Sequence, residues 1–205
     1  MKGRPLFIVF EGIDGSGKST QCDLLHRHAL SLGLDALRCA EPTEGPRGRE
    51  IRAMLRKKEM APPEEQHRLF LLDRIDDAER RIIPALREGK IVIMDRYYHS
   101  NAAYQGAAGM APERVIAENR AAGVPEPDRV YFIDIPPGIA MKRIALRNTG
   151  EGDIFEKERF LEKVREIFLS IADGRFIAID GRGGVEEIFD EVRRDFDEMI
   201  PAYRG

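Results

Sequence analysis

The sequence predicts an α/β fold in which a parallel sheet carries helices on both faces. Five short apolar runs alternate with longer charged segments whose apolar residues recur at helical spacing, and this alternation is typical of a parallel sheet. The run Ile91–Met94 is apolar without interruption, as in a strand buried on both sides. No linker divides the 205 residues, so one domain spanning 1–205 is expected.

The expected elements follow in chain order. The strands are Leu6–Phe10, Ala36–Ala40, Ile91–Met94, Val130–Ile135 and Phe176–Ile179. A helix is expected from about Glu64 to Glu88, where the apolar residues keep helical spacing. Residues 99–128 are expected to form a small-residue loop and then a helix from Pro112 to Ala122.

A candidate lid lies between two further helices. The Pro136-Pro137 pair starts a helix expected to reach about Leu146, since proline fits the first helical turn. Helical spacing resumes from Phe155 to Ala172. The stretch between, Asn148–Gly152, is polar and contains glycine, which is what a movable flap needs. We therefore expect a lid at about 143–157, with an ordinary surface loop as the alternative.

Composition and charge exclude several classes of protein. With 42% hydrophobic and 34% charged residues and a formal net charge of −3, the chain is typical of soluble proteins and has no electrostatic reason to bind nucleic acid or an anionic membrane. Leu6–Phe10 is too short for a signal-peptide core or a membrane span, so a cytoplasmic location is expected. Cys22 and Cys39 lack partners at metal-ligand spacing and are expected to be reduced thiols.

The strongest motif is a complete G-x-x-x-x-G-K-[ST] phosphate-binding loop, or P-loop, at Gly12–Ser19. It follows an expected strand and precedes helical spacing, which is the setting that the motif requires. Its glycines let backbone N–H groups surround phosphate oxygens, Lys18 would contact the β- and γ-phosphates, and the Ser19 hydroxyl would ligate Mg²⁺. The sequence thus predicts binding of ATP and Mg²⁺. The residues expected to hold the nucleotide are Gly12, Ile13, Asp14, Gly15, Ser16, Gly17, Lys18, Ser19 and Thr20.

Two classes of P-loop protein remain, a nucleotide hydrolase and a kinase with a second substrate. A GTPase would need an N-K-x-D motif, which the sequence lacks, and the D-x-x-G at Asp180–Gly183 follows the last expected strand, in the wrong order for a hydrolase switch. Asp95 and Arg96 end a buried strand, where ligands of parallel sheets bind. Asp95 is expected to hold Mg²⁺ through water and Arg96 to bridge two phosphates, the alternative being an ion pair between these neighbours. This arrangement favours a kinase.

Two weaker patterns concern the second substrate and the lid. Phe70 and Arg74 are spaced i, i+4, so an aromatic ring and a guanidinium would lie beside one planar base, or else form core edge and surface. The basic residues Lys142, Arg143 and Arg147 would close over the transferred phosphoryl group, or else form a solvated helix face.

At this point the residues resemble the thymidylate kinase family. The matching segments are F-E-G-I-D-G-S-G-K-S-T-Q (10–21), E-P-T-E-G-P-R-G-R-E-I-R (41–52), L-F-L-L-D-R (69–74), D-R-Y-Y-H-S-N-A-A-Y-Q-G (95–106) and D-I-F-E (153–156). The second and fourth are specific to this family. The resemblance implies a nucleoside monophosphate kinase-like fold with a five-stranded parallel sheet and a lid, usually as a homodimer. It also implies transfer of the γ-phosphoryl group of ATP to dTMP, which gives dTDP and ADP for dTTP biosynthesis.

The resemblance further implies roles for residues that would bind the nucleoside. Phe70 would stack on thymine, and Arg74 would bond a base carbonyl. Asn101 and Gln105 would read the pyrimidine edge, and Tyr104 would crowd C2′ of the sugar, which favours deoxyribose.

Other implied roles concern the sugar, the phosphates and adenine. Asp14 would accept from the 3′-hydroxyl, Arg52 and Arg96 would hold the dTMP phosphate, and Arg182 would lie near adenine. Catalysis would then be mostly positioning and charge neutralisation, because the attacking phosphate oxygen is already ionised. The groups expected to supply it are Lys18, Asp95 with Mg²⁺, Arg96 and the lid arginines Arg143 and Arg147.

The chain departs from parts of the family pattern. Some members carry an arginine inside the P-loop, where this chain has Gly15 and Ser16, so it resembles the branch whose lid supplies the catalytic arginine. Ile154 stands where a basic lid residue is expected, which leaves Arg143 and Arg147 as the candidates.

Two alternative functions stay open. One is a kinase for another nucleotide or for a nucleoside, although a nucleoside lacks the phosphate that Arg52 and Arg96 would hold. The other, from a different class, is a nucleotide-binding protein without catalytic activity, which Ile154 in the lid leaves possible and the intact Lys18 and Asp95 oppose.

Overall fold

A five-stranded parallel sheet forms the centre of the computed structural model, which describes residues 5–56, 61–146 and 154–204. The sheet order is β2-β3-β1-β4-β5, and each neighbouring pair is parallel. Its strands are β1 (Leu6–Glu11), β2 (Ala36–Ala40), β3 (Ile91–Asp95), β4 (Arg129–Asp134) and β5 (Phe176–Asp180). This confirms the predicted fold class, and each strand matches its predicted bounds to within one residue.

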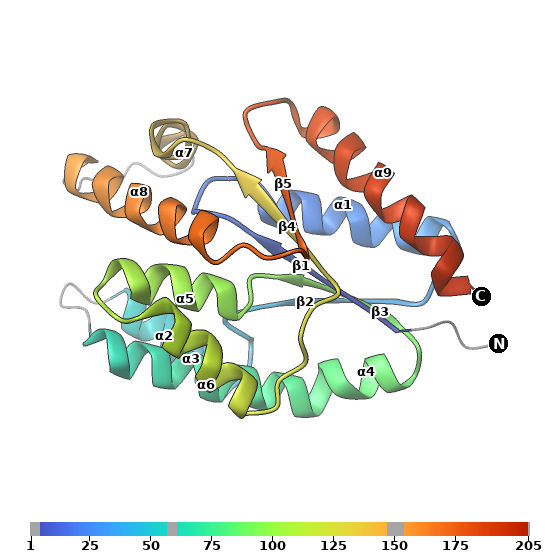
Figure 1. Ribbon diagram of the computed structural model, residues 1–205, viewed down its shortest axis with the longest axis horizontal. Coiled ribbons are helices and arrows are strands. Elements are labelled where there is room, and N and C mark those ends of the chain that lie inside the picture. The colour runs from blue at the N-terminus through green and yellow to red at the C-terminus, as the bar shows by residue number, and fades with distance from the viewer. Residues whose placement is uncertain (1–4, 57–60, 147–153, 205) are drawn as a thin grey trace.

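Helices cover both faces of the sheet (Figure 1). They are α1 (Lys18–Ser31), α2 (Pro46–Leu55), α3 (Pro63–Asp77), α4 (Ile83–Arg87), α5 (Tyr98–Ala107), α6 (Pro112–Ala121), α7 (Pro137–Ala145), α8 (Ile154–Ser170) and α9 (Val185–Arg204). A π-helical segment, η1 (Ala78–Ile82), joins α3 to α4. Within the described ranges, no helix is both long enough and apolar enough to cross a membrane.

Alternation along β1 divides the core into two layers. Ile8 and Phe10 are fully buried on the face that α1 and α9 cover, where Phe196 packs. Phe7 and Val9 point to the opposite face, toward η1 and α4. Successive side chains of a strand point to opposite sides, so both faces of a central strand must be apolar. The continuous apolar run that predicted a buried strand therefore has a direct structural cause.

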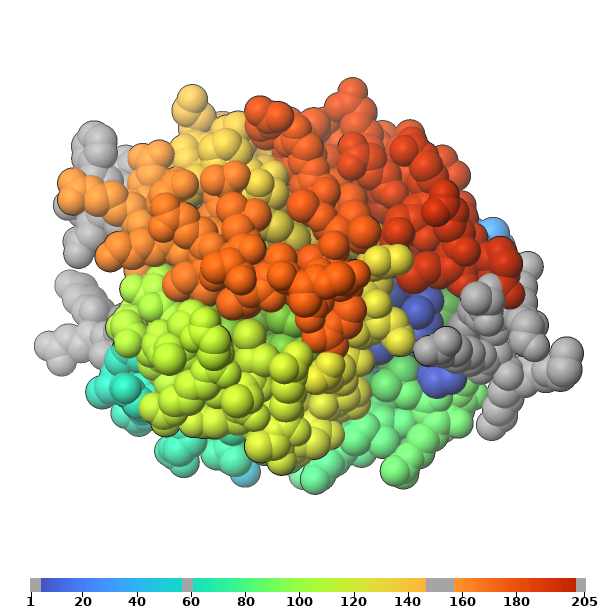
Figure 2. All heavy atoms as spheres, in the orientation of Figure 1, coloured from blue at the N-terminus to red at the C-terminus, as the bar shows by residue number. Residues whose placement is uncertain are grey.

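The prediction of a loop after residue 98 was wrong, because Tyr98–Ala107 forms helix α5. The small residues that predicted a loop instead allow this helix to pack closely against its neighbours, since Ala102 and Ala103 are fully buried. Gly106 has the same constraint: a Cβ there would lie 2.9 Å from the Pro112 side chain. In Figure 2 the surface of α8 lies directly against that of α5 and α6. Close helix packing, which local spacing does not reveal, thus decides this segment.

The expected lid is described only in part. Helix α7 ends at Ala145 and α8 begins at Ile154, close to the predicted helix bounds. The stretch 147–153, which includes Asn148–Gly152 and Arg147, lies outside the described residues. The proposal of a lid at about 143–157 therefore stays a prediction.

Removal of a ring from the α9 face should measure how strongly that layer stabilises the fold. Phe196 is fully buried against the sheet, so Phe196→Ala is expected to lower the free energy of unfolding by about 3–5 kcal/mol through lost burial and a cavity. Equilibrium urea unfolding gives this value. Leu169→Ala, at a side chain that is 46% exposed, is the control and should cost less than about 1 kcal/mol. Equal losses in the two variants would contradict the assigned core.

Candidate active site

The P-loop joins β1 to α1 and has the backbone that its glycines permit. Gly12, Gly15 and Gly17 all have positive φ, at 150°, 83° and 99°, a region that other residues rarely adopt. A Cβ on Gly12 would lie 2.7 Å from the Ile133 carbonyl oxygen, and one on Gly15 would lie 2.6 Å from that of Ala140. The loop is therefore packed against β4 and α7, so its backbone N–H groups are held in place at the start of α1.

Lys18 is the buried cation of this loop. Its Nζ donates to the Ile13 carbonyl oxygen at 3.2 Å, and the residue is only 5% exposed. Burial and the nearby Arg96 lower the pKa of Lys18 to about 8, against the opposing effect of Asp14 and Asp95. A bound polyphosphate would favour the charged form. Lys18 is thus a desolvated cation positioned for a phosphate ligand.

Ser19, Thr20 and Asp95 are the remaining groups around the phosphate and metal position. Ser19 and Thr20 follow Lys18 in the first turn of α1, where the Ser19 side chain is exposed. Asp95 ends β3 and is 7% exposed, yet its Oδ1 atom has no hydrogen-bond partner. A buried carboxylate oxygen without a partner is costly. Together with the Ser19 hydroxyl it is an oxygen donor set of the kind that Mg²⁺ prefers, so these residues fit the metal.

Arg96 connects the P-loop to the neighbouring cavity. Among the residues that the structure describes, it is the one non-glycine residue with positive φ, at 69°, a conformation that costs on the order of 1 kcal/mol or more. Its Nη1 donates to Ser100 Oγ at 3.1 Å and its Nη2 pairs with Asp14. The guanidinium also lies over the Tyr104 ring at 5.3 Å. The sequence left an Asp95–Arg96 ion pair open, but the carboxylate paired with Arg96 is that of Asp14.

Asp14 responds to this cationic environment. Burial would raise the pKa of its carboxyl, but Arg96 and Lys18 outweigh burial and hold the pKa below its ordinary value. Its backbone N–H donates to Tyr104 Oη at 3.1 Å. Asp14 therefore stays ionised, with its carboxylate available to accept hydrogen bonds.

Glu11 is a site residue that the sequence reasoning missed. It is fully buried, and its Oε1 accepts from the backbone N–H groups of Tyr97 and Ser100 at 2.9 and 3.0 Å. Its Oε2 accepts from Ser100 Oγ. The carboxylate thus caps the start of α5 and fixes the turn that contains Arg96. Burial raises its pKa to about 7, against the hydrogen bonds from Ser100 and the charge of Arg96. A glutamate at the end of an apolar strand, just before a P-loop, could have drawn attention to it.

A cavity of about 460 Å³ opens beside the P-loop and Arg96. Apolar surface dominates it, with a few polar groups, as is typical of a small-molecule site. Of the eight residues expected to bind the second substrate, all but Arg52 line it. The lining residues are Asp14, Glu41, Pro42, Leu55, Gln66, Phe70, Arg74, Arg96, Tyr97, Ser100, Asn101, Tyr104, Gln105, Ala108 and Phe160. The fold therefore brings together residues that are far apart in the sequence.

Arg74 lines the cavity, and three hydrogen bonds to buried acceptors fix its guanidinium. Its Nε and Nη2 donate to Glu41 Oε2 at 2.9 and 2.5 Å, and its Nη1 donates to Asn119 Oδ1 at 2.6 Å. Its guanidinium also lies 5.2 Å from the Tyr97 ring centre. Burial raises the pKa of Glu41, and Arg74 opposes that change. The guanidinium is therefore rigid, and hydrogens that these contacts do not use remain for a ligand.

Three further predicted arginines, Arg52, Arg143 and Arg182, are described by the structure but do not line the cavity. Arg52 donates at 2.8 Å to the carbonyl oxygen of Pro42, which lines the cavity, and pairs with Glu44 at 2.9 Å. Arg143 donates to the carbonyl oxygens of Ser16 and Gly181, at 3.3 and 2.9 Å, so it joins the P-loop to the turn after β5. Arg182 is exposed in that turn and pairs with Asp180 at 2.7 Å. Arg147 lies outside the described residues.

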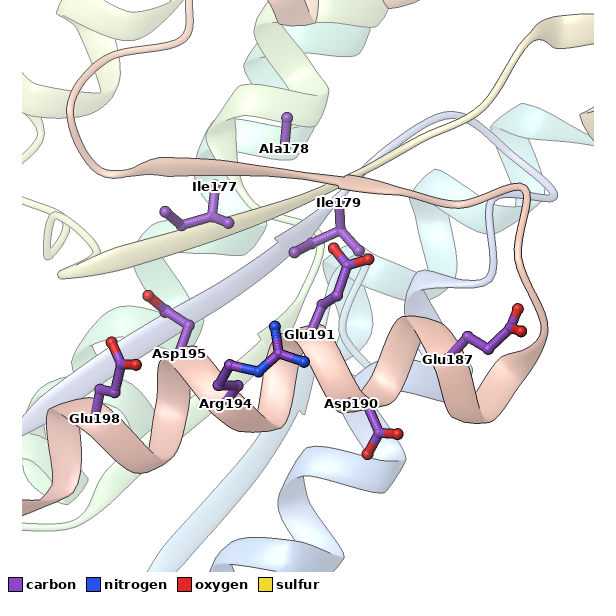
Figure 3. Close-up of a pocket in the computed structure, with 9 residues that line it drawn as sticks. All are labelled: Ile177, Ala178, Ile179, Glu187, Asp190, Glu191, Arg194, Asp195 and Glu198. Atoms are coloured by element: carbon purple, nitrogen blue, oxygen red, sulfur yellow. The ribbon is translucent and has the colours of Figure 1, made fainter.

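A second hollow, between β5 and α9, has a different character (Figure 3). Its lining includes the carboxylates of Glu187, Asp190, Glu191, Asp195 and Glu198, with Arg194 among them, and Figure 3 labels these residues. Such a surface repels phosphates. The cavity beside the P-loop is therefore the better site for a nucleotide.

The parallel sheet, the P-loop and the adjoining cavity define a P-loop kinase of the nucleoside monophosphate kinase type. Comparison with known proteins agrees, because the thymidylate kinase family model matches residues 10–192. A thymidylate kinase of Leptospira interrogans is 38% identical over 193 residues, which are 94% of each chain. One from Akkermansia muciniphila is 40% identical over 204 residues, covering 100% of this chain and 96% of its own. A probable thymidylate kinase of Archaeoglobus fulgidus is 37% identical over 95% of this chain and 96% of its own. The chain belongs to the thymidylate kinase family.

The buried Glu11 makes a prediction about pH and stability. Its folded-state pKa of about 7 lies above the ordinary 4.5, so the folded protein binds this proton more tightly. The free energy of unfolding should therefore fall as pH rises from about 4.5 to 7, by about 3 kcal/mol from this group. Glu11→Gln should remove that part of the slope, as urea unfolding at a series of pH values would measure. Parallel pH curves for the native and variant proteins would contradict a buried titrating Glu11.

Proposed function

We propose that this chain transfers the γ-phosphoryl group of ATP to dTMP, giving ADP and dTDP. The observation that carries the proposal is the position of Arg96, which lines the cavity and pairs with the P-loop residue Asp14. A monophosphate beside Arg96 would face the terminal phosphate of a nucleotide held by Lys18. The two substrates would thus meet with their phosphates adjacent, as in-line transfer requires.

The cavity suits a pyrimidine deoxynucleotide. Among its lining residues, Phe70 offers an aromatic face, and Arg74, Asn101 and Gln105 offer polar groups. Base stacking on an aromatic ring contributes about 1–3 kcal/mol, and the polar groups give direction to binding. Tyr104 is held beneath Arg96, where it would restrict the space near the sugar C2′.

Phosphoryl transfer in this site relies on charge neutralisation. Arg96, together with Arg52, would hold the dTMP phosphate, while Lys18 and the P-loop N–H groups would hold the phosphates of ATP. Asp14, which stays ionised, would accept from the sugar 3′-hydroxyl. A strong base is unnecessary because the attacking phosphate oxygen already carries charge.

Mg²⁺ is part of the proposal, and Ser19 and Asp95 would hold it. The partnerless Oδ1 of Asp95 supports this placement. When bound, Mg²⁺ would neutralise phosphate charge as the phosphoryl group moves. The lid arginines Arg143 and Arg147 would add positive charge from the opposite side, and Arg182 would lie beside adenine. We also propose that residues 1–205 act as a single domain, as a homodimer, in the cytoplasm.

The direct test is ADP release with ATP and Mg²⁺, compared among dTMP, dUMP, dGMP, thymidine and no acceptor. We expect turnover to be strongest with dTMP and negligible without an acceptor. Turnover with thymidine but not dTMP would favour a nucleoside kinase instead. ADP release that does not depend on an acceptor, or no release at all, would contradict the kinase proposal.

Loss of the aromatic face should act mainly on substrate binding. Phe70→Ala is expected to raise the KM for dTMP by about tenfold or more, with a smaller change in the KM for ATP, since stacking on the base is worth about 1–3 kcal/mol. Steady-state kinetics with each substrate varied in turn measures both constants. Phe189→Ala, at an α9 ring packed on the far face of the sheet, is the matched control. Equal effects on the KM for dTMP and the KM for ATP would contradict the placement of Phe70 at the base site.

A further inference from the structure

A chain of buried amide groups runs along one wall of the cavity. It begins at the Ala61 carbonyl oxygen, which accepts from Gln66 Nε2 at 2.7 Å. Gln66 Oε1 accepts from Gln105 Nε2 at 3.1 Å, and Gln105 Oε1 accepts from Asn101 Nδ2. Asn101 Oδ1 then faces His67 Nδ1 at 2.8 Å. All four side chains are at least 94% buried.

The direction of every hydrogen bond in this chain follows from its first member. A backbone carbonyl can only accept, so Gln66 must turn its NH₂ group to Ala61 and its oxygen to Gln105. The same reasoning orients Gln105 and then Asn101, whose oxygen must point to His67. Nδ1 of His67 therefore has to carry a hydrogen and donate it. In a neutral ring this leaves Nε2 without a hydrogen.

The other ring nitrogen also faces an acceptor. His67 Nε2 lies 2.8 Å from Glu118 Oε2, and Glu118 is held in turn by Arg114 Nε at 2.7 Å. The hydrogen bonds from Arg114 and His67 keep the pKa of Glu118 below its ordinary value. Both ring nitrogens of His67 are thus held at 2.8 Å, Nδ1 by Asn101 and Nε2 by Glu118.

We propose that His67, held by Glu118, is a positioning residue that fixes the amide orientations of Asn101 and Gln105, and so makes the cavity select a pyrimidine with a 4-oxo, N3–H edge over a 4-amino pyrimidine. This inference rests on the proposed function, because it concerns the base of the same monophosphate substrate. His67 does not line the cavity, whereas Asn101 and Gln105 do, so its effect would pass through them.

The selectivity follows from the chemistry of the two base edges. Thymine places an acceptor, O4, beside a donor, N3–H, whereas cytosine places a donor, the 4-amino group, beside an acceptor, N3. An amide that can turn over would match either edge. An amide with its oxygen fixed by His67 and its nitrogen fixed by Gln105 matches only one, because the other edge would put donor against donor.

The test compares two substrates that differ only at this edge, dTMP and 5-methyl-dCMP. His67→Asn keeps an N–H donor near the Nδ1 position, whereas His67→Gln keeps a donor near Nε2, toward Glu118, and loses the one to Asn101. We expect the ratio of kcat/KM for dTMP to that for 5-methyl-dCMP to fall about tenfold or more in His67→Gln. The ratio should change less than about threefold in His67→Asn. Arg120→Gln is a control on helix α6, which also carries Glu118. The native Arg120 side chain pairs with Glu126, so this variant should leave the ratio unchanged.

Failure of this inference is distinguishable from failure of the proposed function. If the native protein turns over dTMP but His67→Gln keeps the native ratio, the role of His67 is overturned and the dTMP kinase function stands. If the native protein does not phosphorylate dTMP, the proposed function itself fails.

A measurement on the native protein keeps the inference testable if His67→Gln does not fold. The ring ¹⁵N spectrum of the four histidines should show a hydrogen on Nδ1 of His67, assigned by comparison with His67→Asn. A ring with Nδ1 free of hydrogen would overturn the proposed orientation of Asn101.

Discussion

Two highly charged anions have to be brought together by a chain whose own net charge is −3, and the structure solves this locally. Arg96 directly follows β3, and Lys18 begins α1 after the loop that leaves β1, the strand that pairs with β3 from Leu6 to Phe10. Three carboxylates, from Glu11, Asp14 and Asp95, surround these cations. Asp14 pairs with Arg96, and the charge of Asp95 favours the charged form of Lys18 by raising its pKa. A bound phosphate would supply negative charge to Lys18 and Arg96 in place of some of these carboxylates.

Rigid placement of the cations depends on groups that never need to touch a substrate. Glu11 fixes the start of α5, and with it the strained backbone of Arg96. Asn119, which does not line the cavity, holds Arg74 together with the cavity residue Glu41. Preorganised groups lose little free energy to ordering when a ligand binds. Helix α6 thereby holds Arg74 directly, through Asn119, and is linked to Asn101 through Glu118 and His67.

The sequence predicted the sheet and the P-loop because their causes are local. A buried strand must be apolar on both faces, and the P-loop glycines are required by positive φ. Helix α5 was missed because its small residues are explained only by contact with α6 and α8. The pairing of Phe70 with Arg74 was visible as spacing, but the partners of Arg74 lie 33 and 45 residues away. Glu11 and His67 were missed for the same reason, since their roles exist only through distant partners.

The contribution of Arg96 to phosphate recognition can be measured by calorimetric titration of dTMP and of thymidine into the native protein and Arg96→Gln. Charge-assisted hydrogen bonds of this kind contribute about 1.5–3 kcal/mol each. The native protein should therefore bind dTMP about tenfold to a hundredfold more tightly than thymidine, and Arg96→Gln should lose most of that preference. Equal affinity of the native protein for the two ligands, or an unchanged preference in Arg96→Gln, would contradict a site organised around the substrate phosphate.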